Sequence, residues 1–219
     1  MGLSVKYKSK EEAQQDHVKN YRSDGIKKGK GQRYSADYHR VGYCVDQIKD
    51  GAYTLEVGCN SGIIAVSLML NKNCYVKAID IVPELVEKAK KHGVFAKVGE
   101  AEDLSRFKDN EFDYVTCSEV LEHLYDPLPA IKEAYRVLKP GGLYIVTVPH
   151  PSSFMVNDPK KKADYHQQDF TMEILDTIFH CVFKRNKVFF SEIPYVKEYC
   201  LANKLDVSRP QWIGLTCRK

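Results

Sequence analysis

The chain has 219 residues, of which 43% are hydrophobic and 28% are charged, and its formal net charge is +4. This length suits one domain, or one domain with an appended cap, and the composition is that of an ordinary globular protein. The small net charge gives no indication of a nucleic-acid partner, and no stretch is apolar for long enough to cross a bilayer.

The seven cysteines are odd in number, and none forms a pair with the spacing of a Cys-x-x-Cys motif. This pattern argues against a disulfide framework and against a structural zinc site. Residues 1–17 are polar and lack the apolar core of a secretion signal. We therefore expect a cytoplasmic protein.

The N-terminal part of the chain is predicted to be helical. Residues 9–22 form a polar helical segment, residues 27–31 combine lysines with glycines as a loop does, and residues 35–48 carry apolar side chains at helical spacing. Residues 1–50 are thus predicted to be a helical cap, and residues 51–219 the main domain.

From residue 52 the pattern alternates between strands and helices. We expect strands over 53–57, 74–81, 95–98, 113–118 and 143–148, and helices over 61–70, 83–93 and 129–138. Residues 139–142, Lys-Pro-Gly-Gly, are expected to form the turn that ends the last of these helices. Such alternation predicts βαβ crossovers and an α/β fold with a parallel sheet.

After residue 149 this alternation pauses. Residues 150–169 contain two prolines and a lysine run, so we expect a long irregular connection, and we assign 150–170 as a lid or substrate loop. A helix over 171–179 and strands over 187–190 and 212–217 follow. Residues 194–208, between those two strands, are expected to form a short helix with turns.

The strongest local signal is a glycine-rich turn between the first strand and its helix. Gly58 allows a sharp turn, Gly62 allows close approach of a bound molecule, and the free N–H groups of the helix start can bind an anionic group. Asn60 breaks the Gly-x-Gly-x-x-Gly pattern of dinucleotide dehydrogenases, and Ile63 stands where a phosphate-binding loop needs lysine.

Asp80 gives a second signal, because it ends the next strand about twenty residues after the turn. An acid at this position can accept hydrogen bonds from ribose hydroxyls. The alternative is an aspartate that caps the helix beginning at Pro83. With the glycine-rich turn upstream, the ribose role is favoured.

Within residues 50–150, several ordered segments resemble class I S-adenosylmethionine-dependent methyltransferases, most closely the small-molecule branch typified by quinone-biosynthesis methyltransferases. The segments are residues 56–62, 80–85, 99–104, 112–115, 120–123 and 136–142. The resemblance implies S-adenosylmethionine as the cofactor. It also implies a doubly wound, mostly parallel seven-stranded Rossmann-like sheet with an antiparallel last strand, for which residues 212–217 are the candidate.

The same resemblance implies roles for individual residues. Glu56, Gly58 and Asn60 would lie near the methionine part, and Cys59 and Gly62 belong to the same cofactor-binding turn. Asp80 would bind the ribose, and the residues that would meet the adenine are Ile81, Glu100, Ala101 and Glu102. Ser118 and Glu119 would lie near the methionine and the methyl group. The chain departs from the family pattern at Asn60-Ser61, where Gly-Thr or Gly-Ser is commoner, and at Glu100, where the family often has aspartate.

Three histidines are candidates for a catalytic base: His150 after the strand 143–148, His123 in the Glu122-His123 motif, and His166 before the helix at 171. Each has a structural alternative, as a packed loop residue, a pocket-shaping residue or a part of the lid. The sequence Glu119 to His123 is not a His-Glu-x-x-His motif, so we expect no metal.

Three functions remain open at this point. The first is methyl transfer to a small molecule, which the loop 150–170 and the cap could enclose. The second is methyl transfer to RNA or protein; the low charge argues against it, and so does the sequence Ser-Glu-Val-Leu where base-amine enzymes commonly have Asn/Asp-Pro-Pro-Tyr/Phe. The third is a non-catalytic scaffold that binds the cofactor. The acceptor and the oligomeric state are not indicated.

Overall fold

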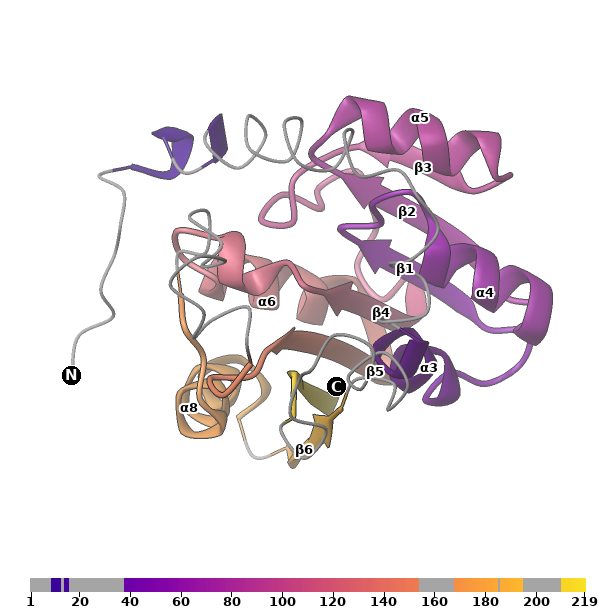
Figure 1. Cartoon of the computed structure of the whole chain (residues 1–219). Coiled ribbons are helices and arrows are strands. Elements are labelled where there is room, and N and C mark those ends of the chain that lie inside the picture. Colours follow the sequence, from indigo (N-terminus) through magenta and orange to yellow (C-terminus); the bar gives the residue numbers. More distant parts are fainter. Residues whose placement is uncertain (1–8, 13, 16–37, 154–167, 185, 195–209) are drawn as a thin grey trace, which may run out of the picture.

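The computed structural model describes residues 9–12, 14–15, 38–153, 168–184, 186–194 and 210–219. Its centre is one seven-stranded sheet with the strand order β3-β2-β1-β4-β5-β7-β6 (Figure 1). The strands are β1 Tyr53–Val57, β2 Tyr75–Asp80, β3 Phe95–Val98, β4 Phe112–Ser118, β5 Leu138–Pro149, β6 Val188–Ile193 and β7 Trp212–Arg218.

The sheet is mostly parallel, as the resemblance implies. Strand β1 pairs in parallel with β2 and β4, β2 with β3, and β4 with β5. Strand β7 is antiparallel to both of its neighbours, β5 and β6. The prediction of a doubly wound parallel sheet with an antiparallel last strand is therefore confirmed.

Helices cover both faces of this sheet (Figure 1). Helices α3 Tyr38–Asp46, α4 Ile63–Lys72 and α5 Pro83–Lys91 supply one hydrophobic core, and α6 Leu128–Val137 and α8 Met172–Phe183 supply the other. Strand residues alternate between the cores: Ala78 packs toward α3, α4 and α5, whereas Val57 and Ile79 belong to the α6 and α8 side. The near-continuous apolar strands thus follow from burial on both faces.

One element boundary in the prediction is wrong. Residues 139–142 do not form a turn that ends a helix, because β5 already begins at Leu138 and includes them. Phe112 pairs with Leu138, the register shifts before Tyr114 pairs with Leu143, and Gly141 N–H donates to the Lys219 carbonyl at 2.9 Å. The pairing of Leu138 with β4 and the hydrogen bonds of Gly141 and Gly142 with Lys219 therefore override the local preference of Pro-Gly-Gly for a turn.

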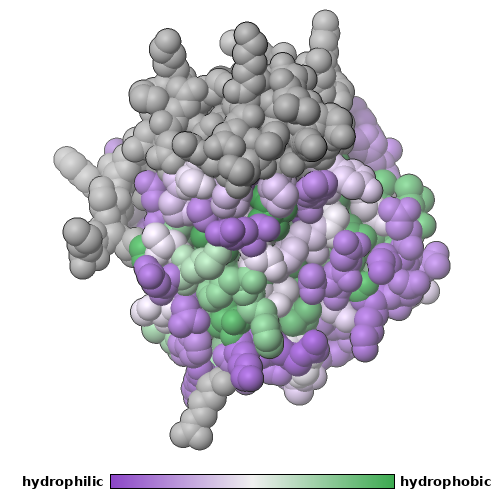
Figure 2. Space-filling view, turned by 60° about the horizontal axis from the view of Figure 1, so that its bottom comes forward, coloured by the Kyte–Doolittle hydropathy of each residue, from purple (hydrophilic) through white to green (hydrophobic). Residues whose placement is uncertain are grey.

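Several predicted segments lie outside the described residues: the loop 27–31, most of the loop 150–170 and nearly all of residues 194–208. The boundary between a cap and a main domain at residue 50 stays a prediction, although α3 supplies Cys44 and Val45 to one core. In the part of the chain that is described, no helix has the length and apolarity to span a membrane. Figure 2 shows a face on which hydrophobic patches alternate with hydrophilic side chains, as on an ordinary protein surface.

Candidate cofactor site

The candidate site lies at the carboxyl ends of β1, β2 and β4. From β1 the sheet extends in one direction through β2 and β3, and in the other through β4 and β5. In open α/β sheets, ligands bind in the crevice outside the carboxyl ends at such a change of direction. The structure brings four of the predicted segments to this edge: the turn 58–62, Asp80, the stretch 99–102 and the pair Ser118-Glu119.

The glycine-rich turn is held by hydrogen bonds to β2. The N–H groups of Gly58 and Cys59 both donate to the Ile79 carbonyl at 2.9 Å. Gly58 has φ +74°, and a Cβ atom there would lie 2.2 Å from Val120 Cγ2, so only glycine fits. Asn60 adopts φ +49°, a left-handed conformation that asparagine tolerates better than most residues. The departure from Gly to Asn is therefore compatible with the turn.

Gly62 has a packing role in addition to the ligand approach predicted for it. A Cβ atom at this position would lie 3.0 Å from Val94 Cγ2 and 3.2 Å from Ala89 Cβ. These neighbours belong to the end of α5 and the segment after it, so Gly62 permits close packing of α4 against α5. Its φ of +85° further favours glycine.

Asp80 connects the turn to the end of β2. Its Oδ2 accepts a hydrogen bond from Asn60 N–H at 2.7 Å, and its Oδ1 accepts one from Val82 N–H at 2.9 Å. Val82 is the residue that precedes α5, so the capping alternative describes one of these contacts correctly. Burial raises the pKa of the Asp80 carboxyl, and the backbone hydrogen bonds oppose that shift. A carboxylate has about four acceptor positions, so the backbone contacts leave capacity for a ribose hydroxyl.

Glu56 points into the protein. Its carboxyl is 2% exposed and accepts a hydrogen bond from Ala65 N–H of α4 at 3.0 Å. Burial raises the pKa of Glu56 to about 8, and the positive charge of Arg40 partly opposes that increase. The contact with α4 makes Glu56 a support of the turn as well as a residue beside the expected methionine position.

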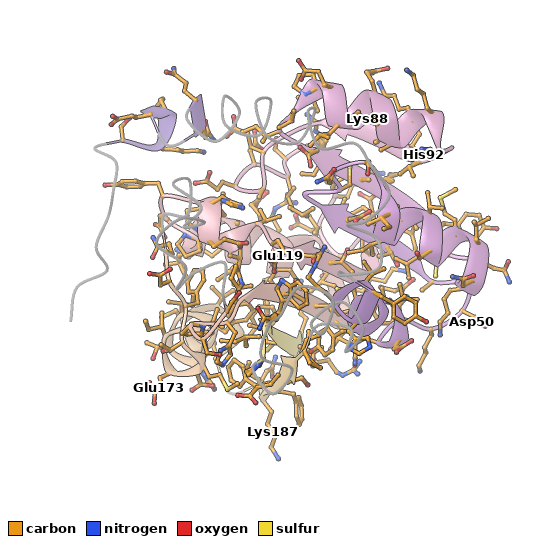
Figure 3. The ribbon with its side chains drawn as sticks, in the orientation of Figure 1. Asp50, Lys88, His92, Glu119, Glu173 and Lys187 are labelled. Atoms are coloured by element: carbon orange, nitrogen blue, oxygen red, sulfur yellow. The ribbon has the colours of Figure 1, made fainter. Side chains whose placement is uncertain are left out.

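A polar cluster lies at the ends of β4 and β5 and is composed of Arg40, Ser118, Glu119, Thr147 and Trp212. Arg40 Nη1 donates to Ser118 Oγ, which also contacts Thr147 Oγ1 at 2.7 Å. The Glu119 carboxyl accepts from Trp212 Nε1 at 2.9 Å and from Thr147 Oγ1 at 3.2 Å. Figure 3 shows Glu119 in the middle of the molecule, whereas Lys88 and Glu173 lie at its periphery.

Glu119 is fixed by its backbone as well. Its φ is +57°, and its N–H donates to the Thr147 carbonyl at 2.9 Å. A left-handed conformation costs a non-glycine residue roughly 1–2 kcal/mol, so the surrounding hydrogen bonds are needed to hold it. The turn after β4 is therefore rigidly placed next to the Gly58 turn.

The stretch expected at the adenine also lies at this edge. Gly99 N–H donates to the Asp80 carbonyl at 3.0 Å, which places the following residues beside Asp80. Ile81 and Ala101 are half-buried. Glu100 and Glu102, in contrast, are bound by the N-terminal segment: Lys10 Nζ lies 3.1 and 3.2 Å from their carboxyl oxygens.

His123 and His150 differ in their surroundings. His123 lies in the short helix η1 Leu121–His123, and its Nε2 is 3.7 Å from the Glu122 carboxyl. Glu122 is 1% exposed, and its pKa is raised well above the usual value by burial and by the charge of Glu119. His123 and Glu122 are thus neighbouring groups after the end of β4 that can each hold a proton.

His150 has both ring nitrogens engaged. Its Nδ1 accepts a hydrogen bond from Ser152 N–H at 3.0 Å, and its Nε2 lies 3.6 Å from the Glu192 carboxyl. Because the lone pair of Nδ1 points at a backbone donor, the proton of a neutral ring lies on Nε2. This arrangement favours the loop-packing alternative for His150. His166 lies outside the described residues.

Three residues of the polar cluster were not found by the sequence analysis: Thr147, which lies within a predicted strand, Arg40 and Trp212. Arg40 stands within a predicted helix and Trp212 at the start of a predicted strand, so each had only a structural interpretation. The guanidinium carbon of Arg40 is 5.8 Å from the centroid of the Trp212 ring, a distance at which cation–π attraction operates. Neither residue carries a local motif that reveals this neighbourhood.

The central part of the chain is similar in sequence to known methyltransferases. Residues 55–146 match the family model described as "Methyltransferase domain". A ubiquinone biosynthesis O-methyltransferase of Xanthomonas oryzae pv. oryzae is 42% identical over 105 residues, which are 45% of this chain and 44% of that protein. Residues 55–146 are thus similar to a methyltransferase domain, and the chain spans less than half the length of this relative.

Solved structures agree on the fold. A protein of Thermotoga maritima described as a possible histamine N-methyltransferase has a TM-score of 0.70 at 21% identity, covering 93% of this chain and 99% of that one. Phosphoethanolamine N-methyltransferase 2 of Haemonchus contortus, in complex with S-adenosyl-L-methionine, has a TM-score of 0.63 at 16% identity, covering 82% and 51%. The fold is that of S-adenosylmethionine-dependent methyltransferases.

Proposed function

We propose that this chain, whose residues 55–146 match the methyltransferase domain model, transfers a methyl group from S-adenosylmethionine to a small-molecule acceptor. The observation that carries the proposal is the contact of the Gly58–Asn60 turn with Asp80 at the carboxyl edge of the sheet. S-adenosylmethionine supplies an activated methyl group, so the protein's own part is to bind, align and exclude water.

The residues at this edge fit the parts of the cofactor. Asp80 would accept hydrogen bonds from the ribose hydroxyls, Ile81 and Ala101 would pack on the adenine, and the Gly58–Asn60 turn would lie against the methionine part. Arg40 donates to Ser118 at the end of β4, the strand that pairs with β1, so its guanidinium would suit the carboxylate of the cofactor.

The acceptor would enter on the side of Ser118, Glu119 and His123. A hydroxyl or amine acceptor must lose a proton before or during attack, and His123 beside the Glu122 carboxyl is the described residue best placed to receive it. The name of the Xanthomonas relative, an O-methyltransferase of ubiquinone biosynthesis, supports a small acceptor. Because six cysteines of the described residues are free thiols, we also propose a cytoplasmic, reducing location.

Ligand binding and methyl transfer test the proposal in sequence. S-adenosylmethionine and S-adenosylhomocysteine should each raise the unfolding temperature, and the shift should grow with ligand excess. Labelled methyl groups should then appear in the small-molecule fraction of a cell extract. Label only in RNA or protein would contradict the proposed acceptor class, binding without any transfer would indicate a scaffold, and no binding would overturn the proposal.

Asp80→Ala tests the ribose assignment. We expect at least about tenfold weaker binding of S-adenosylhomocysteine by calorimetry, the loss of roughly one charge-assisted hydrogen bond. Asp113→Ala is the matched control, because Asp113 also accepts a backbone N–H, from Tyr53 at 3.0 Å, but at the opposite edge of the sheet. Equal affinity of both variants and the wild type would contradict the assignment.

A further inference from the structure

A helical turn near the N-terminus is bound to the stretch that follows β3. Lys10 Nζ lies 3.1 Å from a carboxyl oxygen of Glu100 and 3.2 Å from one of Glu102, and Gln14 Nε2 donates to Glu100 at 2.9 Å. Lys10 and Gln14 are four residues apart, so both side chains lie on the same face of the turn. We call residues 9–12 and 14–15 the N-terminal strap.

The strap lies at the cofactor edge of the sheet. Glu100 and Glu102 come directly after Gly99, whose N–H donates to the Asp80 carbonyl, so the acids held by the strap adjoin the proposed ribose-binding residue. Figure 1 shows the strap, in indigo, on the side toward which the arrows of β1 and β2 point. Side-chain contacts between segments about 90 residues apart therefore lie beside the proposed adenosyl end of the site.

The electrostatics of the two acids depend on the strap. The Glu102 side chain is only 6% exposed, and burial raises the pKa of its carboxyl, whereas the Lys10 contact lowers it. Glu100 is more exposed, and the hydrogen bond from Gln14 lowers the pKa of its carboxyl. Without the lysine, two neighbouring carboxylates would repel each other in a half-buried position.

We propose that Lys10 and Gln14 are positioning residues of the cofactor site, which hold the strap on Glu100 and Glu102 and thereby slow the exit of adenosyl compounds. The inference rests on the proposed function, because it needs S-adenosylhomocysteine to occupy this edge. It assigns Glu100 to anchoring the strap, in place of the adenine contact expected from the resemblance. Because coupling is reciprocal, a bound adenosyl compound should also hold the strap more firmly.

The rate at which S-adenosylhomocysteine leaves the full chain tests the proposal, and it is measured by ligand displacement in a stopped-flow instrument. Lys10→Met should speed release about fivefold, the effect of losing contacts worth somewhat more than one exposed ion pair. Raising the salt concentration should reduce the difference between the variant and the wild type. Lys90→Met is the matched control, because Lys90 forms an exposed ion pair of 2.7 Å with Glu87 on α5.

The same Lys10→Met substitution in a chain without the two acids distinguishes a positioning role of Lys10 from a general loss of stability. Lys10→Met should have no further effect on release in a Glu100→Gln, Glu102→Gln chain, because its partners are already neutral. The unfolding temperature of each ligand-free variant reports any global change. Release from Lys10→Met at the wild-type rate, or an undiminished effect in the double-glutamine background, would overturn the inference. A wild-type chain that binds no adenosyl compound would overturn the proposed function itself.

Discussion

Buried acidic residues at the carboxyl ends of the parallel strands and acidic residues at the amino ends have different partners, and their pKa values are shifted in opposite directions. At the carboxyl edge, Glu56, Asp80 and Glu122 are buried and their pKa values are raised. Among the described residues, no hydrogen bond reaches either carboxyl oxygen of Glu122. At the amino edge, Lys77 contacts Glu111 at 2.7 Å and Lys139 contacts Asp113 at 2.7 Å.

The pairs at the amino edge leave their acids with lowered pKa values. Burial alone would raise the pKa of Glu111, but hydrogen bonds from Lys77 and from the Lys108 backbone outweigh that effect. At the carboxyl edge, Glu100 and Glu102 do contact a lysine, Lys10. The three buried acids named above instead have backbone donors or charges farther away. We infer that the ion pairs at the amino edge stabilise the fold. At the carboxyl edge the buried acids cost folding free energy, and we infer that they are retained because they bind or position a ligand.

The largest expected difference between the two edges is in how the free energy of unfolding depends on pH, and Glu56 causes it at the carboxyl edge. Its pKa is about 8 in the folded chain against 4.5 when unperturbed, so the folded state retains a proton that the unfolded state loses above pH 4.5. The stability of the wild type relative to Glu56→Gln should therefore fall as the pH rises from 4.5 to 8, by roughly 4 kcal/mol. Urea unfolding at pH 5, 7 and 8.5 measures this difference.

Glu111→Gln allows the same comparison of stability with pH at the amino edge, where we expect the pH dependence to have the opposite sign. Because the pKa of Glu111 is lowered on folding, its contribution to stability is present above pH 4.5 and is lost as the pH falls below that value. The two variants should thus diverge from the wild type in different pH ranges. Parallel pH profiles for both would break the comparison between the edges.

Two glycines with similar backbone conformations give the next effect. Gly58 has φ +74° and Gly141 has φ +79°, but a Cβ atom meets Val120 at 2.2 Å in the first and nothing within 4 Å in the second. Gly141→Ala should cost about 1 kcal/mol through its φ alone, whereas Gly58→Ala should cost about 3 kcal/mol because overpacking is added. Urea denaturation measures both, and equal costs would show that the carboxyl-edge turn is not sterically constrained.

The features that the sequence predicts well are those with a local cause. The alternation of apolar strands and amphipathic helices predicted the parallel sheet, and the positions of Gly58 and Asp80 followed from strand ends twenty residues apart. The prediction for Lys139 to Gly142 failed because β5 is extended there by pairing with β4 and β7, which no local pattern reveals.

The remaining parts of the site depend on contacts between distant segments. Arg40 reaches Ser118 across 78 residues, and Trp212 reaches Glu119 across 93 residues. For Asp80 the sequence left two roles open, ribose binding and capping of α5. The hydrogen bond from Val82 N–H shows that the capping contact exists. The Asp80 carboxylate still has acceptor capacity for a ribose hydroxyl. A single sequence without such contacts cannot show which charged side chains converge.

The smallest expected effect is at Lys139, and it sharpens the comparison most directly. The side chains of Lys139 and Asp113 are 43% and 38% exposed, so solvent screens their attraction and Lys139→Met should cost less than about 1 kcal/mol. Raising the salt concentration should shrink even this cost, since exposed charges are screened within about 10 Å at 0.1 M salt. S-adenosylhomocysteine affinity should be unchanged, because the pair lies at the edge opposite Asp80. A loss of affinity in Lys139→Met would mean that the two edges are energetically coupled, and the division into a stabilising edge and a binding edge would then be wrong.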